Sequence, residues 1–250
     1  MMRGGLIGIA LGILGVAAPG TALPVPAPAP ARVLFIGNSL TFANNLPAMV
    51  EALAGRDRVS CRVVAFPDFS LEDHWQRGDA VREIATGGWS TIVLQQGPSA
   101  LPESRVLLVE YTKRFDAEAK RIGARTALYM VWPSKARMGD FDGVSASYTA
   151  AAATVGGLLL PVGDAWRAAW RRDANVALYG PDNFHPSVAA TYLAALVIVE
   201  RLTGRSPVGL PSTIASGSDT VSLPAATARL LQEAAADVDA RVGRSAPGER

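Results

Sequence analysis

Five apolar runs of strand length recur along the chain, and segments with helical spacing separate them. The runs are rich in Val, Ile and Leu and cover residues 32–36, 58–66, 90–96, 125–132 and 158–163. Helical spacing covers residues 46–55, 103–123, 144–157, 164–173, 186–204 and 223–243. Apolar strands that alternate with helices are typical of a parallel sheet covered on both faces. The sequence therefore predicts one α/β domain, a three-layer α/β/α sandwich with a mostly parallel sheet.

The composition agrees with one globular domain. Of the 250 residues, 49% are hydrophobic and 18% are charged, which permits a large buried core and argues against global disorder. The formal net charge is only +2 and no block of like charges occurs. The charge pattern therefore favours neither nucleic acid nor an anionic membrane surface as a partner.

The first thirty residues differ from the rest of the chain. A short basic start precedes the apolar run 6–18, and small residues follow up to Ala22. This pattern predicts a cleaved signal peptide, with an uncleaved anchor as the alternative, and hence a secreted or periplasmic protein with no membrane span after cleavage. We predict a signal peptide at 1–22, a proline-rich extended spacer at 23–31, the domain at 32–243 and a frayed tail at 244–250.

Cys61 is the only cysteine of the chain, so no internal disulfide can form. An exported domain without disulfides must be stabilised by its core, which a chain of this length can build. Cys61 lies in an apolar run, and we expect a buried structural thiol there.

Ser39 stands at the place where a nucleophile is most useful in such a fold. It follows the first apolar run, in Gly37-Asn38-Ser39, and a helical segment comes soon after it. Ligands bind outside the carboxyl ends of parallel strands, so this serine lies at the edge where chemistry is expected. The alternative is an ordinary turn residue. The glycine of a G-x-S-x-G elbow is missing, since Thr41 stands in its place.

The second candidate is the pair Asp182 and His185, in a loop that leads into the helical segment 186–204. Three residues separate the two, so one compact turn can bring the carboxylate to the imidazole. Such a contact fixes the tautomer and stabilises the imidazolium that forms when a serine loses its proton. The alternative is that both residues only cap the loop and the helix.

Two further segments carry polar residues that can border a site. His74 lies beside Glu72 and Asp73, either in a solvated acidic patch or in a loop that shapes the substrate pocket. Gln95 and Gln96 end the third apolar run, and adjacent strand residues face opposite ways, so only one of them points at a given site. A glutamine amide that donates to a tetrahedral oxyanion stabilises it. The alternative is that these amides only hydrogen-bond loop carbonyls.

Two motifs of the chain resemble the SGNH/GDSL hydrolase superfamily. "FIGNSLT" resembles its first block, with Asn38 in place of the usual Asp, and "PDNFHPS" resembles its last block, with an Asp-x-x-His pair. The resemblance extends from Arg32 to about Gly204. It implies a flavodoxin-like SGNH fold with Ser39 as nucleophile, His185 as general base and acid, and Asp182 as its orienting partner.

The resemblance also implies an oxyanion hole, and here the chain departs from the pattern. The superfamily uses the serine N–H, a glycine N–H of the second block and an asparagine side chain of the third. The corresponding second block has no glycine before Ser70, so a backbone N–H at Phe69 or Ser70 is expected to substitute. The third block resembles branches in which glutamine replaces asparagine. We therefore expect Ser39, Ser70 and Gln96, in preference to Gln95, as the donors.

These features predict an exported serine esterase that forms an acyl-enzyme with a Ser-His-Asp triad. Short-chain or acetyl esters, of a small molecule or a polysaccharide, are the expected substrates. No His/Cys cluster has metal-ligand spacing, and we expect neither a metal nor an organic cofactor. The alternatives are an acyltransferase acting on sugar hydroxyls and a non-catalytic carbohydrate-binding module that retains the fold. The sequence leaves the acyl length, the alcohol partner and the oligomeric state open.

Overall fold

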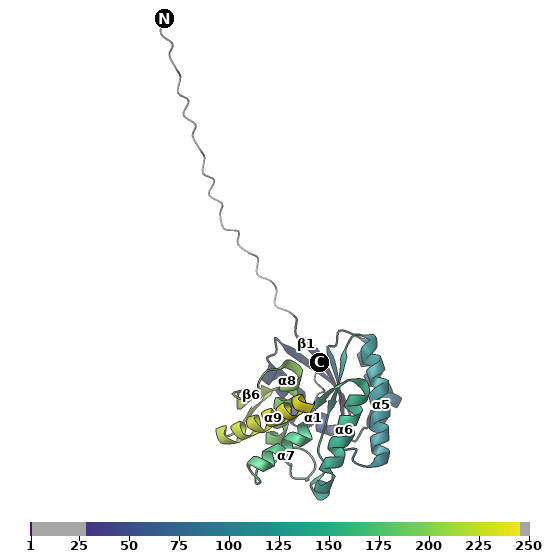
Figure 1. Ribbon diagram of the computed structural model, residues 1–250, viewed down its shortest axis with the longest axis vertical. Helices are drawn as coiled ribbons and strands as arrows, with labels where there is room; N and C mark the ends of the chain where they lie inside the picture. The colour runs from purple at the N-terminus through teal and green to yellow at the C-terminus, as the bar shows by residue number, and fades with distance from the viewer. Residues whose placement is uncertain (2–28, 246–250) are drawn as a thin grey trace.

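The structure, a computed structural model, describes Met1 and residues 29–245, so the predicted signal peptide, most of the spacer and the end of the tail lie outside the described residues. Within the described part, five parallel strands form the central sheet in the order β2-β1-β3-β4-β5 (Figure 1). The strands are β1 (Ala31–Gly37), β2 (Val59–Ala65), β3 (Thr91–Leu94), β4 (Arg125–Tyr129) and β5 (Leu158–Leu160). The predicted fold class is confirmed.

Helices cover both faces of this sheet, with α5 and α6 on one side and α8 and α9 on the other (Figure 1). The α-helices are α1 (Ser39–Phe42), α2 (Leu46–Ala54), α3 (Leu71–Arg77), α4 (Asp79–Ala85), α5 (Pro102–Arg121), α6 (Phe141–Val155), α7 (Val162–Arg172), α8 (Val188–Thr203) and α9 (Ala225–Ser245). The 3-10 helices are η1 (Ala43–Asn45) and η2 (Lys135–Asp140), and β6 (Thr213–Ser216) with β7 (Asp219–Ser222) forms an antiparallel hairpin. No helix in the described part of the chain is long and apolar enough to cross a bilayer.

The segment around His74 is a helix, where the sequence analysis considered a solvated acidic patch or a loop bordering the site. It forms α3, which begins with a capping box: the Ser70 hydroxyl accepts the Asp73 N–H, and the Asp73 carboxylate accepts the Ser70 N–H. Gly78 ends the helix in the left-handed conformation, which glycine adopts without strain. The Ser-x-x-Asp spacing followed by a glycine is the local signal that indicates this helix.

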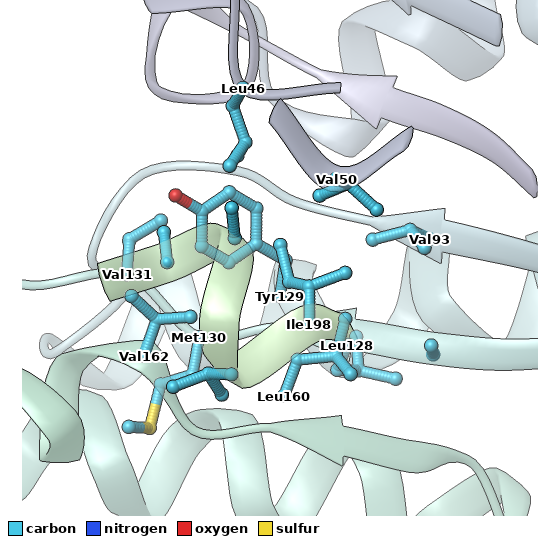
Figure 2. Packing of buried hydrophobic residues seen from close by; sticks show 14 of the residues in the cluster. Leu46, Val50, Val93, Leu128, Tyr129, Met130, Val131, Leu160, Val162 and Ile198 are labelled. Carbon is cyan, nitrogen blue, oxygen red and sulfur yellow. The ribbon is translucent and has the colours of Figure 1, made fainter. Parts of the chain in front are cut away.

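The core lies between the sheet and its helices (Figure 2). Val93, Leu128 and Leu160 from three neighbouring strands are fully buried, and Ile198 of α8 packs on this layer. Helix α8 is buried along its whole middle, from residue 190 to 199, because the sheet, α2, α7 and α9 all contact it. A helix that is apolar all round is expected in such a central position. Cys61 packs against this core from β2, and burial together with the nearby Glu51 carboxylate raises the pKa of its thiol.

The strand order determines where a site can form. The chain places β2 on one side of β1 and β3, β4 and β5 on the other, so its direction of winding reverses between β1 and β3. In open parallel sheets, ligands bind in the crevice outside the carboxyl ends of the strands at this reversal point. Ser39 follows β1 and Gln95 follows β3, so both residues stand at that crevice.

Gly163→Ala is expected to lower the free energy of unfolding by about 2–3 kcal/mol, the usual effect of overpacking a core. A Cβ at Gly163 would lie 2.2 Å from the carbonyl oxygen of Val131, and this backbone atom cannot rotate away. Urea unfolding of the variant measures the loss. Gly139→Ala is the matched control, since nothing lies within 4 Å of its Cβ position. A wild-type stability for Gly163→Ala would show that the packing there is loose.

Candidate active site

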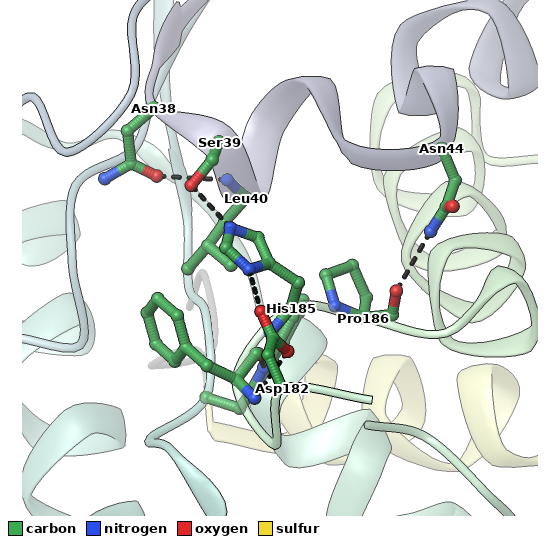
Figure 3. A network of polar contacts seen from close by, with 9 residues as sticks. Asn38, Ser39, Leu40, Asn44, Asp182, His185 and Pro186 are labelled. Atoms are coloured by element: carbon green, nitrogen blue, oxygen red, sulfur yellow. Dashed lines mark hydrogen bonds and ion pairs between the residues drawn. The ribbon is translucent and has the colours of Figure 1, made fainter. Parts of the chain in front are cut away.

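Ser39, His185 and Asp182 lie in one hydrogen-bonded chain (Figure 3). The Ser39 Oγ is 2.8 Å from His185 Nε2, and His185 Nδ1 is 2.5 Å from Asp182 Oδ2. An ionised carboxylate only accepts hydrogen bonds, so Nδ1 carries the proton of the neutral ring and Nε2 presents its lone pair to the serine. In this arrangement the imidazole is able to accept the hydroxyl proton.

The backbone of its own loop holds Asp182 in place. Oδ1 accepts the N–H groups of Phe184 (3.0 Å) and His185 (2.9 Å), and the Gly180 N–H closes the loop on the His185 carbonyl at 2.7 Å. The bond from His185, together with the two backbone N–H groups, lowers the pKa of Asp182 to about 2. Because this pKa is below the unfolded value, the contribution of the carboxylate to stability is complete above about pH 4 and is lost as the pH falls toward 2.

Contacts from two other parts of the chain anchor this loop. The Trp132 indole N–H, beyond the end of β4, donates to the Phe184 carbonyl at 3.0 Å. The Asn44 amide donates to the Pro186 carbonyl at 3.0 Å (Figure 3). It also donates to the Thr191 hydroxyl at 2.8 Å. Asn44 lies in η1, directly after the helix that begins with Ser39, so it connects the Ser39 segment to the histidine loop.

Gln95, which the sequence analysis placed second to Gln96 as an oxyanion donor, contacts the turn that carries Ser39. Its side chain is buried, and its Oε1 accepts the Asn38 N–H (2.8 Å) and the Thr41 hydroxyl (2.7 Å). Its Nε2 donates to Asn38 Oδ1 (3.0 Å) and to the Gln96 carbonyl (2.5 Å). Gln95 therefore uses both ends of its amide to hold the turn that carries Ser39.

Gln96 and Ser70, two of the predicted oxyanion donors, have other partners. The Gln96 Oε1 accepts the Leu71 N–H at 3.1 Å, and its Nε2 donates to the Ser99 hydroxyl at 2.8 Å. The Ser70 N–H donates to Asp73 Oδ2 at 2.8 Å. The Ser39 N–H, in contrast, is the first of a helix and therefore has no carbonyl four residues before it within that helix. The part of Gln96 and Ser70 in an oxyanion hole stays a prediction.

The segment before Ser70 contains a residue in the left-handed backbone conformation. Asp68 has a φ of +61°, in the left-handed region that glycine favours and that aspartate tolerates better than most residues. The next carbonyl, of Phe69, accepts a 3.0 Å hydrogen bond from the Asn38 amide. This contact joins the segment to the turn that carries Ser39.

Two cavities border the histidine loop. The larger, of about 890 Å³, is lined by residues that include Asn44, Trp170, Tyr179, Asn183 and Val188. The smaller, of about 150 Å³, is lined by residues that include Ser99, Leu101, Ser134, Arg137 and Phe184. Among the described residues, no group of three or more His, Cys, Asp or Glu side chains is placed to hold a metal ion.

The comparison with solved structures decides the family. A protein assigned to the SGNH hydrolases, from Slackia heliotrinireducens, is 29% identical, with a TM-score of 0.59, over 69% of this chain and 99% of its own. The chain belongs to the SGNH/GDSL hydrolase superfamily. The resemblance that its two motifs indicated is thereby confirmed.

Two more distant structures share the SGNH fold with this chain. One is a DUF4886 family protein from Bacteroides uniformis, 20% identical, with a TM-score of 0.66 over 84% of this chain and 95% of its own. The other is an acetylxylan esterase from Geobacillus stearothermophilus, 13% identical, with a TM-score of 0.56 over 71% and 97%. No protein-family model matches the sequence, and no curated protein matches it either.

Proposed function

We propose that this chain is an ester hydrolase that works through a serine acyl-enzyme. The observation that carries the proposal is the contact of the Ser39 hydroxyl with the lone pair of His185 at 2.8 Å, with Asp182 behind the ring. Ser39 Oγ attacks the ester carbonyl while His185 Nε2 takes its proton, and the tetrahedral intermediate collapses as His185 returns the proton to the leaving alcohol. Water then attacks the acyl-enzyme with His185 as base, which releases the acid and restores Ser39.

The negative charge of the tetrahedral intermediate needs donors that are already in place. We propose the Ser39 N–H as the first of them, because the helix that it begins supplies no partner for it. Gln96 and Ser70 are the further donors expected from the sequence. Before either could donate to the oxyanion, Gln96 Nε2 would have to break its hydrogen bond to the Ser99 hydroxyl, and the Ser70 N–H would have to break its hydrogen bond to Asp73.

For the substrate, we propose a short-chain ester, with an acetyl ester of a polysaccharide as the leading case. An acetylxylan esterase is among the proteins of similar fold, and this likeness supports an acetyl ester. The cavities of about 150 and 890 Å³ border the histidine loop, but their linings include neither Ser39 nor His185, so their size does not determine the acyl length. A secreted or periplasmic location, as the first thirty residues predict, fits such a substrate.

The test is the reaction of the purified protein with a fluorophosphonate, followed by intact-mass spectrometry. We expect one adduct on the wild type, located on Ser39 by peptide mapping. No adduct on a folded wild type would refute the acyl-enzyme mechanism. A panel of p-nitrophenyl esters from acetyl to palmitoyl tests the acyl length, and cleavage of the long esters alone would refute the short-chain proposal. Product analysis with a sugar acceptor present separates hydrolysis from acyl transfer.

A further inference from the structure

His74 is fully buried next to the turn that carries Ser39. It takes no part in the proposed reaction. It lies on α3, and its ring packs against Phe66 and Phe69, with centroids 5.8 and 5.2 Å away. Its Nε2 is 2.7 Å from the carbonyl oxygen of Gly37, the last residue of β1. This placement excludes both the solvated patch and the bordering loop considered from the sequence.

The contact determines the protonation of this ring. A carbonyl oxygen only accepts hydrogen bonds, so the Nε2 of His74 carries the proton. The Nδ1 is buried and has no hydrogen-bond partner among the described residues, so a second proton there would have no acceptor. Burial accordingly lowers the pKa of His74, and Arg77 acts in the same direction, while the Gly37 carbonyl, Asp73 and Asp79 raise it in part. The ring stays neutral, as a fixed donor.

The same peptide unit is held at both ends. The carbonyl oxygen of the Gly37–Asn38 peptide accepts from His74 at 2.7 Å and from the Phe66 N–H at 3.2 Å. The N–H of the same peptide donates to Gln95 Oε1 at 2.8 Å. Gly37 also has no room for a side chain, since a Cβ would lie 2.3 Å from the Thr41 hydroxyl and 2.4 Å from Gln95 Oε1. The next peptide unit along the chain carries the Ser39 N–H. The orientation of one peptide plane therefore sets where the nucleophile and its N–H point.

We propose that His74 is a positioning residue for the reaction of Ser39, which it serves by holding the Gly37 carbonyl through its Nε2–H. The proposal rests on the proposed function, because it assigns His74 a role in that same site. Without this donor the Gly37 carbonyl keeps only the longer bond from the Phe66 N–H, at 3.2 Å, and the Ser39 turn can tilt. A displacement of about 1 Å at a reacting group lowers the rate by about 100-fold.

Two substitutions distinguish a positioning role of His74 from a role in core packing alone. His74→Leu fills the space and removes the donor, whereas His74→Gln places an amide N–H near the position of Nε2. We expect His74→Leu to lower kcat for p-nitrophenyl acetate, and the rate of fluorophosphonate labelling, by about 10- to 100-fold with little change in KM. We expect His74→Gln to recover most of the loss. Thr112→Val is the control, because it changes another buried side chain, whose hydroxyl has no partner among the described residues.

A purely structural role would lower the melting temperature of both His74 variants and leave the kcat of the folded protein unchanged. That result, or an equal loss of kcat in both variants, would overturn the proposal. Labelling of the wild type and its loss in Ser39→Ala test the proposed function separately, so the two failures are distinguishable.

The wild-type protein supplies a measurement that does not depend on the folding of variants. In a ¹⁵N-labelled sample, long-range imidazole correlation spectra report which ring nitrogen carries the proton. We expect His74 to show the Nε2–H tautomer at pH 8. An Nδ1–H tautomer would overturn the proposal, because Nε2 could then not donate to the Gly37 carbonyl.

Discussion

Ser39→Ala is expected to abolish the fluorophosphonate adduct and to lower kcat for ester hydrolysis by about 10⁶-fold. The substitution removes the oxygen that His185 Nε2 contacts, so no acyl-enzyme forms. His185→Ala should cause a similar loss, because a serine hydroxyl without a base is a weak nucleophile. Since the two residues act as one unit, the double variant should be no less active than either single variant.

Ser90→Ala is the matched control for this experiment. Ser90 directly precedes β3, at the opposite edge of the sheet from Ser39, and its hydroxyl donates to the Arg32 carbonyl. Its labelling and its kcat should equal those of the wild type. An adduct that persists in Ser39→Ala would show that another residue is the nucleophile. Losses that multiply in the double variant would show that Ser39 and His185 act independently.

Asp182→Asn is expected to lower kcat by about 10⁴-fold, with the fold intact. The pKa of Asp182 is lowered to about 2, so in the wild type a charged carboxylate faces His185 at every pH at which the enzyme is assayed. An asparagine can turn its amide toward Nδ1 and draw the ring into the other tautomer. The Nε2 would then carry the proton and could no longer accept one from Ser39.

The measurement is kcat and KM for p-nitrophenyl acetate, with circular dichroism as the test of folding. Asp173→Asn is the control, because Asp173 likewise accepts a backbone N–H two residues ahead, that of Asn175, in an exposed turn. It should leave both constants unchanged. A wild-type kcat for Asp182→Asn would show that the carboxylate only shapes its loop.

Much of the fold could be predicted from the sequence because the signals are local. The apolar runs at residues 32–36 and 125–132 overlap β1 and β4, and the helical spacing at 103–123 overlaps α5. Each of these follows from a continuous apolar run of strand length or from an apolar spacing of about 3.6 residues. The short helix α3 was missed, since seven residues are too few for the period to show and only the Ser70 cap and Gly78 mark it.

The choice between Gln95 and Gln96 could not be made in this way. Adjacent strand residues face opposite sides of the sheet, but the sequence does not say which side holds the nucleophile turn. The pairing of β3 with β1 places Gln95 against Asn38, while Gln96 turns toward Leu71. The acidic neighbours of His74 suggested an exposed patch, but they do not determine the burial of its ring. Successive residues of a helix point about 100° apart, so a buried ring can follow an exposed carboxylate.

The sequence by itself determined the α/β class. It also placed Ser39 after a strand and Asp182 and His185 in one turn. These features could be predicted because periodicity and turn chemistry act over a few residues. Only the tertiary structure decided that Ser39 and His185, 146 positions apart, lie 2.8 Å from each other. That distance depends on the order of the strands, on Asn44 and Trp132 anchoring the loop, and on Gln95 and His74 holding the turn. These contacts form between segments remote in sequence, and their geometry is set by the packing of the whole domain.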